Sequence, residues 1–102
     1  MNTMVQEHMS DLATLCVRFR VRRLELFGSG SGDRFDPTRS DLDFLVEFHP
    51  LPAGERADAY FELKESMEAL FGRPVDLVMT RAIRNPYFLE AIKSSRVQLY
   101  AA

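Results

Sequence analysis

The sequence has a single cysteine among its 102 residues and no long run of apolar residues. A lone cysteine excludes an internal disulfide framework, so Cys16 is expected to be a buried structural thiol on one face of a helix. A reduced thiol suits a cytosolic protein, and the sequence therefore predicts a cytoplasmic location. No apolar run approaches the roughly 18 residues of a membrane span, and the N-terminus, interrupted by Glu7 and Asp11, lacks a signal-peptide layout.

An excess of positive charge is also missing, because the formal net charge is -2 and the isoelectric point is about 5.6. Such a chain has no general attraction to phosphate backbones, and direct nucleic-acid binding is not expected. Four arginines nevertheless gather near the start of the first expected strand: Arg18, Arg20, Arg22 and Arg23. We find no repeat, low-complexity segment or linker, so residues 1–102 are expected to form one domain with a single core.

The spacing of apolar residues predicts an α+β fold in which helices pack on one face of a small mixed sheet. In chain order the expected elements are a helix over 3–19, a strand over 21–27, a loop over 28–40, a strand over 41–48, a helix over 55–71, a strand over 75–79, a helix from Pro86 to about Ser94 and a strand over 97–100. The clearest strand alternates strictly, which places Leu42, Phe44, Val46 and Phe48 on its buried face. A connection as long as 28–40 indicates a functional loop.

Two aspartates mark the start of that clearest strand. Asp41 and Asp43 project from the same side, about 6.6 Å apart along the backbone, and their mutual repulsion is relieved most easily by a divalent cation. Mg²⁺ prefers one or two carboxylates together with phosphate oxygens, and the glycine-rich stretch 28-GSGSGDR-34 stands just upstream. Taken singly, an Asp-x-Asp pair is common on solvent-facing strands and a Gly-Ser cluster is usually a plain turn; their combination predicts a nucleoside triphosphate site.

The order of these motifs resembles the nucleotidyltransferase superfamily related to DNA polymerase β, whose signature is Gly-Ser followed by Asp-x-Asp. Here the matching residues are Gly28, Ser29, Asp41 and Asp43, and Asp76 begins a later short strand as the third acid. The short length and the segments SDLDFLVEF, VDLV and NPYFLEAI are similar to the minimal nucleotidyltransferase (MNT) group. This resemblance covers nearly the whole chain and implies the polymerase β-like nucleotidyltransferase fold.

The resemblance also implies roles for individual residues. Asp41, Asp43 and Asp76 would be catalytic residues and ligands of Mg²⁺, and the triphosphate of ATP would lie against the glycine-rich stretch 28–34. The expected nucleotide-binding residues are Gly28, Ser29, Gly30 and Arg34. The family usually has an arginine soon after Gly-Ser; it is absent at that position, and Arg34 or Arg39 is expected to replace it.

Members of this group commonly act as the antitoxin of a HEPN-domain ribonuclease toxin, by transferring AMP from ATP to a tyrosine of that toxin. The same function is therefore expected here. Two alternatives stay open: a non-catalytic module that masks the toxin by contact, which the altered Gly-Ser loop favours, and a small-molecule nucleotidyltransferase. The second is disfavoured because the chain supplies no extra domain to hold a small acceptor. The identity of the partner, the number of nucleotides added and assembly into a homo-oligomer are left open by the sequence.

Overall fold

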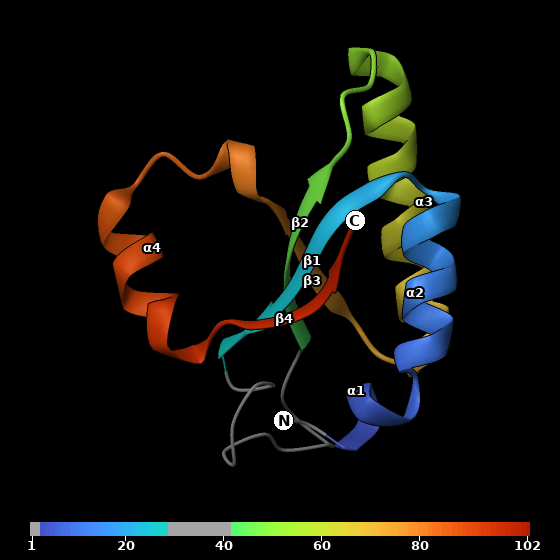
Figure 1. Cartoon of the computed structure of the whole chain (residues 1–102), viewed down its shortest axis with the longest axis horizontal. Coiled ribbons are helices and arrows are strands. Elements are labelled where there is room, and N and C mark those ends of the chain that lie inside the picture. Colours follow the sequence, from blue (N-terminus) through green and yellow to red (C-terminus); the bar gives the residue numbers. More distant parts are fainter. Residues whose placement is uncertain (1–2, 29–41) are drawn as a thin grey trace.

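The computed structural model describes residues 3–28 and 42–102 (Figure 1). In chain order its elements are α1 (Thr3–Glu7), α2 (Met9–Arg18), β1 (Val21–Phe27), β2 (Leu42–Phe48), α3 (Ala53–Phe71), β3 (Val75–Met79), the short 3-10 helix η2 (Thr80–Ala82), α4 (Pro86–Ile92), a second 3-10 turn η3 (Lys93–Ser95) and β4 (Val97–Ala101). The expected helices and strands are present in the described residues, with one division: the helix predicted over 3–19 is broken at His8 into α1 and α2. The loop expected over 28–40 lies, apart from Gly28, outside the described residues.

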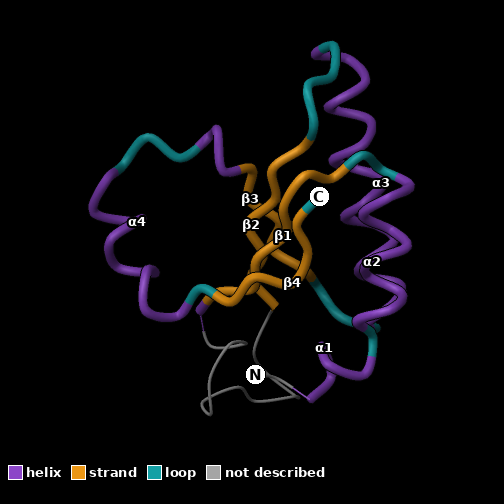
Figure 2. The backbone as a smooth tube through the Cα atoms, viewed as in Figure 1, coloured by secondary structure: helices purple, strands orange, loops and turns teal. Residues whose placement is uncertain are grey.

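The four strands form one mixed sheet in the order β3-β2-β1-β4. Strand β1 is antiparallel to both β2 and β4, whereas β2 and β3 run parallel. A parallel pair needs a crossover connection, and the long helix α3 provides it between β2 and β3 (Figure 2). The predicted α+β class with a small mixed sheet is therefore confirmed.

The main core lies between the sheet and the helices α1, α2 and α3. Leu42, Phe44 and Val46 of β2 are at most 1% exposed, and Phe48 packs against the same cluster, as the period-two alternation predicted. The other buried members include Val5, Leu12, Cys16, Leu24, Leu26, Leu63, Met67 and Phe71. Burial raises the pKa of the Cys16 thiol to about 12, which agrees with the expected structural cysteine.

A smaller cluster covers the opposite face of the sheet. Phe27 and Leu45 point away from the main core, and Ile92 of α4 packs on them. In Figure 1, α4 accordingly lies on the other side of the sheet from α2 and α3. The structure thus adds a helix on a face that the expected arrangement had left uncovered, because Phe27 and Leu45 give that face an apolar patch.

Two helix termini have well-defined caps. Helix α3 ends at Gly72, whose φ of 65° is the left-handed conformation that favours glycine. Helix α4 begins as predicted, with Pro86 in its first turn and the Asn85 side chain accepting a hydrogen bond from the Tyr87 N–H at 2.9 Å. Within residues 3–28 and 42–102, no helix combines the length and the apolar character needed to cross a membrane.

Candidate nucleotide-transfer site

The parallel pairing of β2 and β3 brings two of the predicted acids together. Asp43 is the second residue of β2 and Asp76 the second of β3, and the two are register partners. Register partners on neighbouring strands point to the same face, with backbones about 4.8 Å apart. Asp43 is half-buried and Asp76 is exposed, so the pair opens toward solvent. Two of the three acids expected to share one cleft therefore lie side by side on the same face of the sheet, and Asp41 lies outside the described residues.

Gly28 completes one wall beside this acid pair. It follows β1 directly, and its φ of 71° is a conformation that residues with a side chain rarely adopt. A Cβ atom added there would lie only 2.8 Å from Asp43 Oδ2, closer than two such atoms can approach. A residue with a side chain at this position would force the Asp43 carboxylate to shift, and glycine avoids this.

Ser95 is a contributor that the sequence did not reveal. The Gly28 N–H donates to Ser95 Oγ at 3.2 Å, and the Ser95 hydroxyl donates to the Ile92 carbonyl at 3.0 Å. The bond joins the end of β1 to η3 across 67 positions of the chain, which no local pattern indicates. It ties Gly28, the first residue of the glycine-rich segment, to η3.

An ion pair beneath this junction holds β4 against β1. Glu25 of β1 is 8% exposed and accepts two hydrogen bonds from Arg96, at 3.1 Å from Nε and 2.7 Å from the terminal nitrogen. These hydrogen bonds raise the pKa of Arg96. Because Arg96 follows Ser95 in the chain, the pair also keeps Ser95 within reach of Gly28.

The rest of the predicted site falls outside the described residues. This applies to Ser29, Gly30, Arg34 and Asp41, so their expected roles remain predictions. Among the residues that the structure does describe, no cluster of three or more histidine, cysteine, aspartate or glutamate side chains is arranged to hold a metal. What is described is a pair of carboxylates, and a pair fits Mg²⁺, which takes one or two carboxylates and fills its remaining positions with water and phosphate oxygens.

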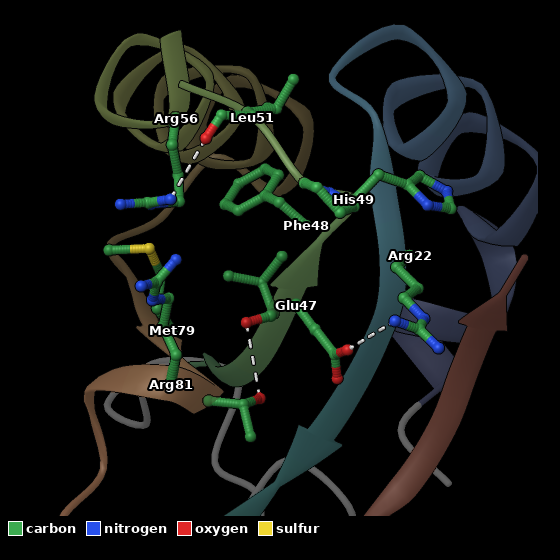
Figure 3. Close-up of a pocket in the computed structure, with 11 residues that line it drawn as sticks. Arg22, Glu47, Phe48, His49, Leu51, Arg56, Met79 and Arg81 are labelled. Carbon is green, nitrogen blue, oxygen red and sulfur yellow. Dashed lines mark hydrogen bonds and ion pairs between the residues drawn. The ribbon is translucent and has the colours of Figure 1, made fainter. Parts of the chain in front are cut away.

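A second polar region lies at the opposite end of the same two strands. A cavity of about 520 Å³ opens where β2 and β3 finish, and we call it the arginine pocket (Figure 3). Its walls include Arg22, Glu47, Phe48, Arg56, Met79 and Arg81. Asp43 and Glu47 are four residues apart on one strand, which separates the acid pair from this pocket by about 13 Å.

Comparison with known proteins places this geometry among nucleotide-transferring domains. The family model described as "Nucleotidyltransferase domain" matches residues 11–99. A protein of Methanocaldococcus jannaschii, provisionally named a protein adenylyltransferase, is 34% identical over 80 residues, which is 78% of each chain.

Solved structures agree with the sequence comparison. A structure provisionally described as a minimal nucleotidyltransferase superposes with a TM-score of 0.70 at 28% identity and covers 95% of both chains. The complex of a tri-AMPylated HEPN toxin with its MNT antitoxin from Shewanella oneidensis gives a TM-score of 0.64 at 21% identity, over 95% of this chain and 72% of that one. The second likeness shows a shared fold.

Proposed function

Since the chain belongs to the nucleotidyltransferase domain family, we propose that it transfers AMP from ATP to a tyrosine hydroxyl of a partner HEPN ribonuclease toxin and so acts as the antitoxin. The observation that carries this proposal is the in-register pair of Asp43 and Asp76 beside Gly28, where an added Cβ atom would lie 2.8 Å from Asp43 Oδ2. The naming of a relative as a protein adenylyltransferase and the AMPylated toxin in a complex of the same fold support the choice of substrate and partner.

The acid pair has the chemistry of a divalent-metal site. Two carboxylates on adjacent strands repel each other by a few kcal/mol at an effective dielectric constant of about 20, so both stay ionised most easily with a cation between them. Asp43 and Asp76, with Asp41 from the preceding segment, would hold Mg²⁺ there. When bound, Mg²⁺ neutralises the triphosphate and favours attack at the α-phosphorus.

The protein's own groups would then position the reactants. The backbone at Gly28 leaves room beside Asp43, and the residues after it, Ser29, Gly30 and Arg34, would bind the triphosphate. Asp76 is exposed, so an acceptor hydroxyl can reach it and give up its proton to that carboxylate. The acceptor oxygen forms a bond to the α-phosphorus as the bond from that phosphorus to the bridging oxygen breaks, and pyrophosphate leaves.

A protein acceptor suits the shape of this end of the sheet. The carboxylate of Asp76 faces solvent, and enclosed pockets for small metabolites usually bury most of the ligand surface. A tyrosine presented on a folded partner needs no such enclosure. The open position of Asp76 therefore favours transfer to a protein over transfer to a small molecule.

The test is the intact mass of the partner after incubation with this protein, ATP and Mg²⁺. The parent should add one or more AMP units, and Asp43→Asn or Asp76→Asn should slow the addition by about a hundredfold or more, a loss of about 2.7 kcal/mol in transition-state stabilisation. Asp58→Asn serves as the matched control, because Asp58 is an exposed acid on α3 outside the pair.

The same variants separate transfer from masking. If the protein protects cells by modification, Asp43→Asn should still co-purify with the toxin and yet fail to protect. Full protection by Asp43→Asn, with an unmodified partner mass for both proteins, would show that the chain acts by contact alone.

A further inference from the structure

The arginine pocket has a chemistry that the transfer reaction does not use. We propose that it is a metal-independent binding site for a nucleoside monophosphate, separate from the acid pair. This inference does not depend on the proposed function, since the pocket lies at the far end of β2 and β3 and shares no residue with the acid pair.

The first argument is charge. The pocket is lined by three arginines and one glutamate in a chain whose overall formal charge is -2. The glutamate is already engaged, because Glu47 lies 3.6 Å from Arg22. Within the described part of the chain, neither Arg56 nor Arg81 has a carboxylate partner. In the pocket, the positive charges of Arg56 and Arg81 are therefore not compensated by any carboxylate of the described residues.

The second argument is the arrangement of those two groups. In Figure 3, Arg56 and Arg81 come from different elements, α3 and η2, and lie on the same side of the pocket as Met79, whereas Arg22 lies on the other side. Arg56 is oriented by its hydrogen bond to the Leu51 carbonyl at 3.3 Å. Guanidinium groups bind phosphate through paired N–H donors, so one phosphate dianion would satisfy both arginines and relieve their repulsion.

The third argument is the size and lining of the cavity. A volume of about 520 Å³ is within the range of about 300–1,000 Å³ typical of small-ligand sites and is far larger than one phosphate ion needs. The lining also includes the partly exposed apolar side chains of Phe48 and Met79. An aromatic ring and a thioether both pack well against a flat base. A ligand with one phosphate and one flat apolar ring matches both halves of the lining.

The walls are tied together before any ligand arrives. The Thr80 hydroxyl donates to the Val46 carbonyl at 3.4 Å, which joins η2 to β2, and the Tyr60 hydroxyl donates to the Leu77 carbonyl at 2.6 Å, which joins α3 to β3. The elements that carry Arg56 and Arg81 are thus each bonded to the sheet. Binding here should need no large rearrangement.

The experiment is a calorimetric titration of the full chain with AMP in excess chelator, with adenosine and inorganic phosphate as comparison ligands. Chelation removes metal-dependent binding at the acid pair and leaves the arginine pocket as the site observed. We expect AMP to bind at least about tenfold more tightly than adenosine, since hydrogen bonds to charged groups are worth that much or more. Inorganic phosphate should bind more weakly than AMP and compete with it.

Variants locate the site. Arg81→Gln should weaken AMP binding about tenfold without affecting folding, because Arg81 is exposed. Arg56→Gln should weaken AMP binding to a similar degree. Arg84→Gln is the matched control, an exposed arginine that does not line the pocket, and it should leave AMP affinity unchanged.

Several results would overturn the proposal. These are no AMP binding in chelator, equal affinity for adenosine and AMP, or the same affinity for the parent and Arg81→Gln. Binding of inorganic phosphate as tight as that of AMP would show that the apolar half of the pocket does not recognise a base. An acidic peptide that binds where AMP does not would assign the pocket to a protein ligand instead.

Discussion

The two ends of the parallel strands β2 and β3 carry opposite charges. At their start, Asp43 and Asp76 stand side by side, whereas at their finish Arg56 and Arg81 line a cavity. A phosphate-bearing ligand is repelled by the first end unless a divalent cation joins it, and it is attracted to the second end directly. Dependence on Mg²⁺ is therefore the property that distinguishes the two ends.

A large loss of activity is expected from Gly28→Ala. The new methyl group would meet the Asp43 carboxylate at 2.8 Å, and the backbone would be held in a conformation that costs alanine about 1–2 kcal/mol. We expect AMP transfer to fall about a hundredfold. Initial rates from the partner-mass assay would measure it, with AMP affinity of the arginine pocket in chelator as the unchanged reference.

Gly72→Ala is the matched control for that change. Gly72 has a similar φ of 65°, but no atom lies within 4 Å of where its Cβ would be. It should lose about 1 kcal/mol of unfolding free energy in urea and keep its full transfer rate. Equal losses of activity in the two variants would show that backbone strain, and not the contact with Asp43, limits the reaction.

The contrast between the ends also explains what the sequence could predict. Alternation within one recognisable motif fixes the direction of Asp43, whereas Asp76 was expected from the family resemblance, and the parallel pairing of β2 with β3 places it beside Asp43. Burial of Leu42, Phe44 and Val46 followed from the same alternation. The direction of Asp43 and the burial of these apolar side chains depend on neighbours in the chain, so a local pattern was sufficient to predict them.

The features that were missed depend on tertiary contacts. The arginine pocket is assembled from the start of β1, the end of β2, the first turn of α3 and η2, so that no stretch of sequence contains it. The hydrogen bond from Gly28 to Ser95 and the ion pair between Glu25 and Arg96 join residues about seventy positions apart. The break of the first helix at His8 was missed because apolar spacing continues through it.

Two ion pairs of the sheet are expected to differ in how much they stabilise the fold. Arg96→Met leaves the buried Glu25 carboxylate without its partner, and it should lower the unfolding free energy by about 2 kcal/mol, below the full value for a completely buried pair because Arg96 is partly exposed. Arg22→Met removes the partner of Glu47 in a pair whose side chains are 57% and 37% exposed, and it should cost less than about 1 kcal/mol.

Urea unfolding of both variants provides the measurement, and ligand binding sharpens it. Because Arg96 keeps Ser95 beside Gly28, Arg96→Met should also weaken Mg²⁺-dependent ATP binding, while AMP binding in chelator should change little. The reverse order of stabilities, with Arg22→Met the more damaging, would contradict the assignment of Glu25 and Arg96 as the structural pair.

A pH-dependent effect is expected from the thiol of Cys16, a residue of α2 that is buried in the main core. Its pKa is raised from 9.0 to about 12 in the folded protein, so between these values the unfolded chain has lost a proton that the folded chain retains. Stability from this group is therefore complete below about pH 9 and is lost as the pH rises, at up to about 1.4 kcal/mol per unit.

Urea unfolding at about pH 8 and about pH 10 would show the loss, and Cys16→Ala should reduce that difference, since other titrating groups are common to both proteins. A folded protein whose thiol reacts as fast as in the unfolded chain would contradict this account.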